Sequence, residues 1–144
     1  MKAKLLNDDR EKTFSLVYET GDEVVAGLTG FAKEHKPRSA HFTAIGAFRD
    51  VVLAYFDWPT KTYQEIPVAE QVEVLSLAGD IAWKEDGEPV VHAHVVVGRS
   101  DGSTRGGHLK KAHVRPTLEL VLVEYPKHLE RRHDSETGLT LIRL

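Results

Sequence analysis

The chain of 144 residues contains no cysteine, which excludes disulfide bonds and thiolate metal ligands. It also lacks any run of about 18 consecutive apolar residues, the length that a membrane-spanning helix needs. The N-terminus, MKAKLLNDDREK, has no apolar segment of the kind that export signals carry. Any metal site must therefore use His, Asp or Glu side chains, and we expect a cytoplasmic protein with no membrane partner.

Several motifs of well-known enzymes are absent as well. The chain has no Gly-Lys-Ser/Thr sequence for a phosphate-binding loop, and the glycines from Gly102 to Gly107 lack the strand-to-helix setting of a dinucleotide-binding loop. Internal repeats and low-complexity tracts are also missing. With 41% apolar and 28% charged residues, the composition is typical of a globular protein, and the length predicts a single domain over residues 1–144.

The net charge is small, but the charged residues are unevenly distributed. The net charge is −3, which argues against a protein that binds nucleic acid with its whole surface. Residues 1–98 carry ten Lys or Arg against 16 Asp or Glu, whereas residues 99–133 carry eight against four. The second segment is either a local basic face that contacts DNA or an ordinary solvated surface.

Hydrophobic periodicity predicts one helix followed by strands. Residues Thr13–Glu19 alternate as a strand does, and Glu23–His35 has apolar residues at helical spacing up to Pro37. The later strands are expected at Ala40–Ile45, Val51–Phe56, Thr62–Ile66, Gln71–Ala78, Ala82–Trp83, Pro89–Val97, Leu118–Glu124 and Leu139–Ile142, with a turn near Gly46 and Asp50 between the first two. The predicted fold class is α+β, a single domain with a mostly antiparallel β-sheet of seven or eight strands and one N-terminal helix packed on it.

The most informative stretch is VVHAHVVVGRSDGSTRGGHL, residues 90–109. In a strand, His92 and His94 point to the same face. A hairpin through Ser100–Ser103 would bring His108 beside them. Three imidazoles are the ligands that a protein commonly supplies to a zinc ion whose fourth coordination position is open. Nickel, copper or iron suits the same ligands. The alternative is that each histidine is a core residue with one hydrogen-bond partner.

Glu119 is a second candidate residue, within the strand LELVLVE. It shares a strand face with Val121 and Val123, where an unpaired buried carboxylate would be costly. It could orient a ligand histidine or act as general base on a metal-bound water. The remaining interpretation is a half-exposed strand residue in an ion pair.

Five segments in this order resemble the plants-and-prokaryotes conserved (PPC) domain: GAFRDVVLAYFD, VEVLSLAGDIA, GEPVVHAHVVVG, GGHL and TLELVL. The resemblance covers a core of about residues 13–124, and its most specific parts are His92-x-His94 and Gly106-Gly107-His108. It implies an α/β fold that assembles as a homotrimer and a metal held at His92, His94 and His108, with Glu119 as the acidic residue of the closing strand. Plant members use an Arg-Gly-Arg-Pro type AT-hook to contact DNA, and this chain has none.

Three functions follow as hypotheses. The first is a stand-alone prokaryotic PPC protein, a homotrimeric binding or regulatory module with zinc or another divalent transition metal. The second is a zinc-dependent hydrolase or lyase that uses the open metal position, with Arg99 or Arg105 clamping an anionic substrate. The third is direct DNA binding through residues 99–133. A cupin is disfavoured because Val95, Val96 and Val97 follow the HxH pair where a glutamate ligand belongs.

Overall fold

The computed structural model describes residues 1–7 and 11–144, which form one helix and nine strands. The elements are β1 (Lys2–Asn7), β2 (Thr13–Glu19), α1 (Val24–His35), β3 (Ala40–Asp57), β4 (Thr62–Val68), β5 (Val72–Lys84), β6 (Pro89–Gly98), β7 (Thr104–Glu124), β8 (Glu130–His133) and β9 (Thr140–Arg143). All nine strands belong to one sheet, in which only β5 and β8 pair in parallel. The predicted fold class is confirmed, while β1 and β8 are strands that the periodicity did not predict. Among the described residues, no helix has the length and apolar character needed to cross a membrane.

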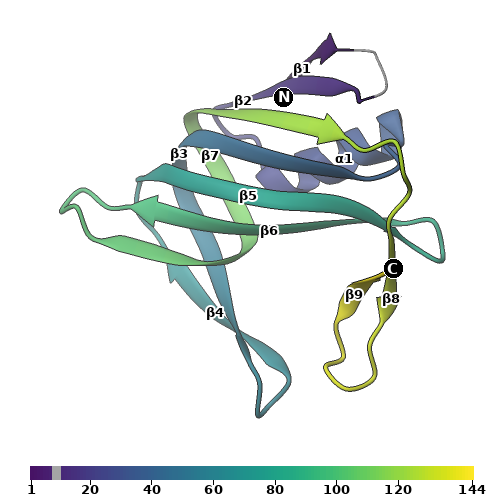
Figure 1. The fold of residues 1–144 in the computed structure, drawn as a ribbon. Helices are drawn as coiled ribbons and strands as arrows, with labels where there is room; N and C mark the ends of the chain where they lie inside the picture. The colour runs from purple at the N-terminus through teal and green to yellow at the C-terminus, as the bar shows by residue number, and fades with distance from the viewer. Residues whose placement is uncertain (8–10) are drawn as a thin grey trace.

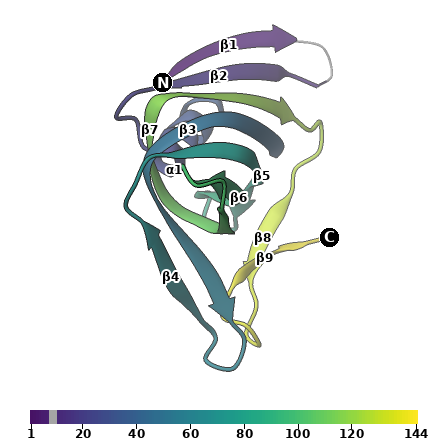
Figure 2. The ribbon, with the colours of Figure 1, turned by 90° about the vertical axis from the view of Figure 1, so that its left-hand side faces the viewer.

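The sheet closes on itself through its longest strands. β3 pairs with β5 and β7, and β6 pairs with both β5 and β7, so these four strands form a closed circuit. The sheet consequently curves around α1, as Figures 1 and 2 show. β1 and β2 extend it at one side, and the β8–β9 hairpin extends it at the other. The circuit thus has an inner face toward α1 and an outer face turned away from it.

The helix begins one residue later than predicted, because Glu23 serves as its cap. The Glu23 carboxylate accepts hydrogen bonds from the backbone N–H groups of Val25 and Ala26, at 3.2 and 2.6 Å. These groups have no partner within the helix, so the cap stabilises its first turn. The buried helix residues are Val24, Leu28, Phe31 and Ala32. They pack against the inner face of the sheet and form one core with it.

The turn expected near Gly46 and Asp50 is wrong: β3 runs without a break from Ala40 to Asp57. The strand bends in this region instead of turning back. The pairing between β3 and β7 is irregular at three places, two of them between Gly46 and Asp50. Gly46 has φ +149°, and a Cβ there would lie 2.3 Å from the carbonyl oxygen of Thr117. Glycine is therefore needed for close strand approach within a bulged strand rather than for a chain reversal.

Candidate metal centre

Three histidines meet on the outer face, where β6 pairs with β7. His92 and His94 flank the buried Ala93 on β6, so their side chains leave the sheet on the opposite side from the core. The β6–β7 turn is closed by the Arg99 N–H, which donates to the Ser103 carbonyl at 2.9 Å. The resulting register places His108 directly opposite His94. The convergence expected from strand alternation and the hairpin is therefore present.

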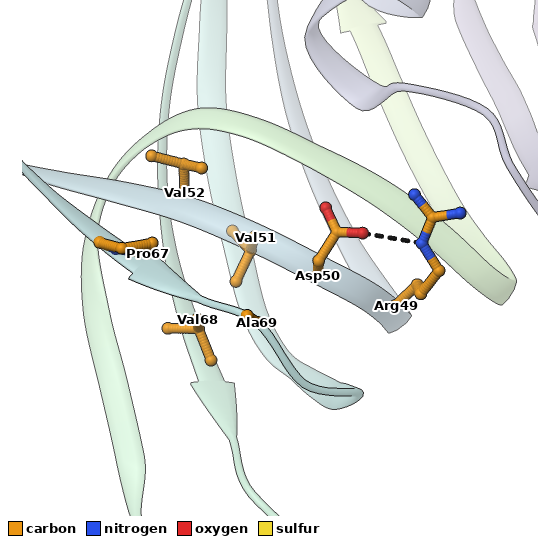
Figure 3. Close-up of a pocket in the computed structure, with 7 residues that line it drawn as sticks. All are labelled: Arg49, Asp50, Val51, Val52, Pro67, Val68 and Ala69. Atoms are coloured by element: carbon orange, nitrogen blue, oxygen red, sulfur yellow. Dashed lines mark hydrogen bonds and ion pairs between the residues drawn. The ribbon is translucent and has the colours of Figure 1, made fainter.

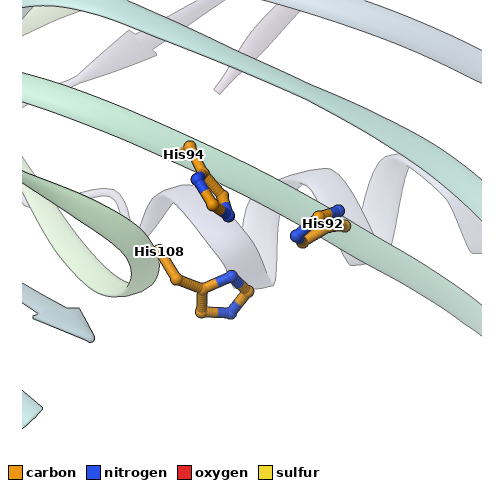
Figure 4. Close-up of side chains that lie close together, drawn as sticks. All are labelled: His92, His94 and His108. Atoms are coloured by element: carbon orange, nitrogen blue, oxygen red, sulfur yellow. The ribbon is translucent and has the colours of Figure 1, made fainter. Parts of the chain in front are cut away.

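The three imidazoles form a compact group, shown in Figure 4. Their ring centroids lie 5.1 Å apart for His92 and His94, 5.3 Å for His92 and His108, and 5.6 Å for His94 and His108. One ring nitrogen from each lies within 4.8 Å of the others. His94 is exposed, whereas His92 and His108 are half-buried. Three imidazoles with one side open to solvent are the ligand set of an open tetrahedral site.

The electrostatics of His108 fit a metal ligand. Its Nδ1 is buried and has no hydrogen-bond partner among the described residues. Burial, reinforced by His92 and His94, lowers the pKa of His108 to about 4, so the ring is neutral at pH 7. In Figure 4 a nitrogen of this ring faces the other two imidazoles. A metal ion among the three rings would supply the partner that this buried nitrogen lacks, since buried polar atoms are normally satisfied.

Asp80 lies behind His92 and was not predicted from the sequence. The two residues pair in register on β5 and β6, and Asp80 Oδ2 lies 3.6 Å from His92 Nδ1. The other carboxylate oxygen of Asp80 accepts a hydrogen bond from Arg131 at 2.7 Å. Burial opposes ionisation of this carboxyl, but the contacts to His92 and Arg131 outweigh it, and the pKa of Asp80 is lowered. A carboxylate on Nδ1 leaves Nε2 of His92 for a metal and orients the ring.

A pocket of about 280 Å³ opens beside the histidines. It is lined by Tyr63, Val90, Val91, His92, His108, Arg131, Leu139, Thr140 and Leu141. The Tyr63 ring stacks on His108, with the centroids 4.8 Å apart. The site thus combines a polar group of three imidazoles with a small and mainly apolar cavity, which is how small-molecule sites are usually built.

The structure does not bring Glu119 to the histidines. Glu119 lies on β7 opposite Ile45 and lines a groove with Leu75 and Val121. This side of β7 is exposed, with Val121 44% accessible, so the valines beside Glu119 do not mark a buried face. The two arginines predicted to clamp a substrate, Arg99 and Arg105, are not among the residues that line the histidine pocket, and Arg99 forms an ion pair with Glu70 at 2.6 Å. The arginine that does line it is Arg131.

A larger hollow of about 470 Å³ lies elsewhere on β3 and β4 (Figure 3). It shares no lining residue with the histidine pocket. Its charged residues satisfy one another: Asp50 accepts from Arg49 at 2.7 Å and contacts Nδ1 of His113 at 2.7 Å. His113 thus pairs with Asp50 and does not belong to the three-histidine group.

The low pKa of His108 predicts a pH-dependent stability of the metal-free protein. The unfolded chain binds a proton at this histidine near pH 6.5, whereas the folded chain does so only near pH 4. Above about pH 6.5 this histidine therefore does not lower the free energy of unfolding. As the pH drops from 6.5 toward 4 the free energy of unfolding falls, because the unfolded state binds more protons in that window. Urea unfolding of metal-free protein at pH 7 and pH 5 measures the effect. His108→Asn should flatten the profile, and an equal slope in both proteins would contradict the assignment.

A small α+β domain with a bent, nearly closed sheet and a three-histidine group on its outer face is the class of protein that these observations define. A model of the Plants and Prokaryotes Conserved (PCC) domain, the family abbreviated PPC above, matches residues 7–126. The chain belongs to this family.

Solved structures agree with this assignment. The metal-containing protein AF0104 from Archaeoglobus fulgidus is 32% identical with a TM-score of 0.84, over 99% of this chain and 97% of that one. A plant- and prokaryote-conserved protein from Pyrococcus horikoshii is 30% identical with a TM-score of 0.85, over 99% and 95% of the two chains.

A curated relative is much longer than this chain. The bifunctional protein GlmU of Synechococcus sp. (strain JA-3-3Ab) is 31% identical over 122 residues. The match covers 82% of this chain but only 18% of that protein, so the similarity concerns one part of it.

Proposed function

We propose that this PPC-domain protein holds one divalent transition metal ion, zinc or a similar ion, through His92, His94 and His108, and acts as a homotrimeric binding or regulatory module. The observation that carries the proposal is the buried Nδ1 of His108, which has no partner in the described part of the chain although it belongs to a group of three imidazoles. The similarity to a metal-containing protein supports it. When bound, such an ion polarises a ligand or water at its open position.

Elemental analysis of protein purified without a histidine tag tests the metal site. We expect about one equivalent of metal per chain, as a three-ligand site with an open position implies. Thermal unfolding before and after removal of the ion by a chelator then separates two roles. A large loss of stability indicates a structural ion, and a small one indicates an ion kept for ligand binding. Less than a tenth of an equivalent after reloading with zinc, nickel, copper or iron would contradict the proposal.

The outer face supports assembly with further copies of the chain. Four large apolar side chains are exposed there, Ile45 at 64%, Leu75 at 53%, Val96 at 41% and Val121 at 44%. Ile45, Leu75 and Val121 line a groove of about 260 Å³ together with Glu119. Contiguous exposed apolar surface of this kind marks an interface. The patch reaches the metal centre, because Val96 follows His94 on the same face of β6.

A charged side chain introduced into this patch is expected to dissociate the proposed trimer into monomers. Ile45→Arg places an unpaired cation in the proposed interface, where desolvation makes it costly. Sedimentation velocity across micromolar concentrations should give a trimer for the wild type and a folded monomer for the variant. Tyr55→Arg is the matched control, since Tyr55 is also on β3 and 62% exposed but does not line the groove. A wild-type chain that is monomeric throughout would remove the assembly from the proposal.

A metal-dependent hydrolase or lyase is the second candidate function. The observation that favours it is the pocket beside His92 and His108, which could hold a substrate next to the open metal position. Turnover of ester, phosphoester or lactone substrates that is lost with the metal, and absent from His92→Ala, would support this function. Inactivity of the metal-loaded protein on all of these substrates would exclude the enzyme and leave the binding module as the proposed function.

The basic segment at residues 99–133 gives less support to DNA as a partner. Three of its arginines are in ion pairs: Arg99 with Glu70, Arg131 with Asp80 and Arg132 with Glu130. Each pair removes a cation that would otherwise bind a phosphate and release counterions. Partners other than further copies of the chain are therefore better sought among proteins and small ligands.

A further inference from the structure

The C-terminal hairpin forms one wall of the pocket at the metal centre. The family match ends at residue 126, whereas β8 and β9 span 130–143. In Figures 1 and 2 this hairpin extends from the sheet on the same side as the tip of β3 and β4. Arg131, Leu139, Thr140 and Leu141 come from it, and they face His92, His108 and Tyr63 across about 280 Å³. The histidines thus lie within the matched residues 7–126, and the opposite wall is formed by residues that follow them.

Arg131 is the charged residue of this wall, and one of its donors is unused. Its side chain is only 6% exposed. One terminal nitrogen donates to the Thr140 carbonyl at 3.0 Å and the other to Asp80 at 2.7 Å. Its Nε is buried and has no hydrogen-bond partner among the residues that the structure describes. A buried cationic N–H without an acceptor is rare. Because Arg131 lines the pocket, an anion bound there would lie beside its guanidinium.

We propose that this pocket binds a small carboxylic acid with a short apolar chain, whose carboxylate lies between Nε of Arg131 and the ion held by the histidines. This inference rests on the proposed function, because the ion supplies the second partner of the carboxylate. The other lining residues suit the apolar part of the ligand, since Val90, Val91, Leu139 and Leu141 carry no charge. A single unused donor matches a carboxylate better than a phosphate, whose three or more oxygens require several. The small volume limits the ligand to a few carbon atoms.

Isovalerate and its neutral isostere isovaleramide are the probes. Isothermal titration of the zinc-loaded wild-type protein should show binding of isovalerate and at least about tenfold weaker binding of the amide, because the amide oxygen still accepts a hydrogen bond but lacks the negative charge that the Arg131 guanidinium and the ion attract. Arg131→Lys keeps the cation but loses the Nε donor, and should weaken isovalerate by a similar factor. Metal content is measured on every sample, so that loss of the ion and loss of the pocket are separate results.

A second pair of variants tests the pocket with Arg131 in place, so that the result does not depend on whether the variant at position 131 folds. Leu141→Trp fills the pocket, whereas Ile142→Trp places the same side chain on its neighbour, which is equally exposed at 36% and does not line the pocket. We expect Leu141→Trp to lose isovalerate binding at full metal content, and Ile142→Trp to retain both. Equal affinity for acid and amide, or unchanged isovalerate binding in Leu141→Trp, would overturn the inference and leave the metal site standing. Absence of metal from the wild-type protein would instead contradict the proposed function.

Discussion

Alanine in place of His108 is expected to remove the metal and leave the fold intact. The affinity for the metal should fall by more than about 100-fold. Removing a residue that only hydrogen-bonds to a metal ligand already costs about 10–100-fold, and His108 is proposed as a ligand itself. The metal-free protein should lose only about 1 kcal/mol, from the ring contact with Tyr63 at 4.8 Å, since the His108 Nδ1 has no hydrogen bond to lose. Competition titration with a metal indicator measures the first effect and urea unfolding the second.

His113→Ala is the matched control for this variant. His113 lies on the same strand, five residues further along, but it contacts Asp50 rather than the other histidines. Metal content should therefore stay at the wild-type level in His113→Ala and fall equally in His92→Ala and His108→Ala. Retention of a full equivalent of metal by His108→Ala would show that the ion sits elsewhere. Loss of metal from all variants together with loss of cooperative unfolding would show a general effect on the fold.

Local patterns were enough to predict that His92, His94 and His108 converge. The alternation of His92, Ala93 and His94 depends only on the two-residue period of a strand, and His108 follows from a short hairpin with glycines after the turn. The helix was predicted for a similar reason, because its apolar spacing and the proline after it are both local. For the helix and for β6, the predicted bounds agree with the structure to within one residue at each end.

The partners of the histidines could not be predicted in this way. Asp80 meets His92 only through the register of β5 against β6, and Arg131 reaches Asp80 because β8 returns beside β5. The sequence near these residues does not indicate which residue pairs with which. A mid-strand aspartate in SLAGDIA was itself a usable hint, since a half-buried carboxylate needs a partner. Glu119 gave the same hint, but the face on which it lies is exposed in this chain.

The bent strands were the other source of error. β3 and β7 have 18 and 21 residues, far beyond the usual strand of five or six. Each pairs with different neighbours along its length. The burial pattern of β3 therefore changes at the bend and imitates two strands with a turn between them, and of β7 only the last part, Leu118–Glu124, was predicted. Such strands are recognisable only once their partners are known, because bulges and register shifts depend on the whole sheet.

Removing the charge of Asp80 is expected to weaken both the fold and the metal site. Asp80→Ala leaves Arg131, which is 6% exposed, without its carboxylate partner, and breaking a buried pair in this way costs about 3 kcal/mol. It also frees the His92 ring, whose Nδ1 lies 3.6 Å from Asp80, so metal affinity should fall by about 10–100-fold. Urea unfolding of the metal-free protein and metal titration measure the two effects separately.

The double variant Asp80→Ala/Arg131→Met separates these two roles. Without a buried unpaired cation, most of the lost stability should return, as it does when a buried ion pair is replaced by apolar groups. Metal affinity should stay low, because His92 still lacks its carboxylate. Asp50→Ala is the control, since that aspartate pairs with His113 and should leave the metal affinity unchanged. Recovery of wild-type metal affinity in the double variant would mean that Asp80 acts on the site only through the fold and does not orient His92.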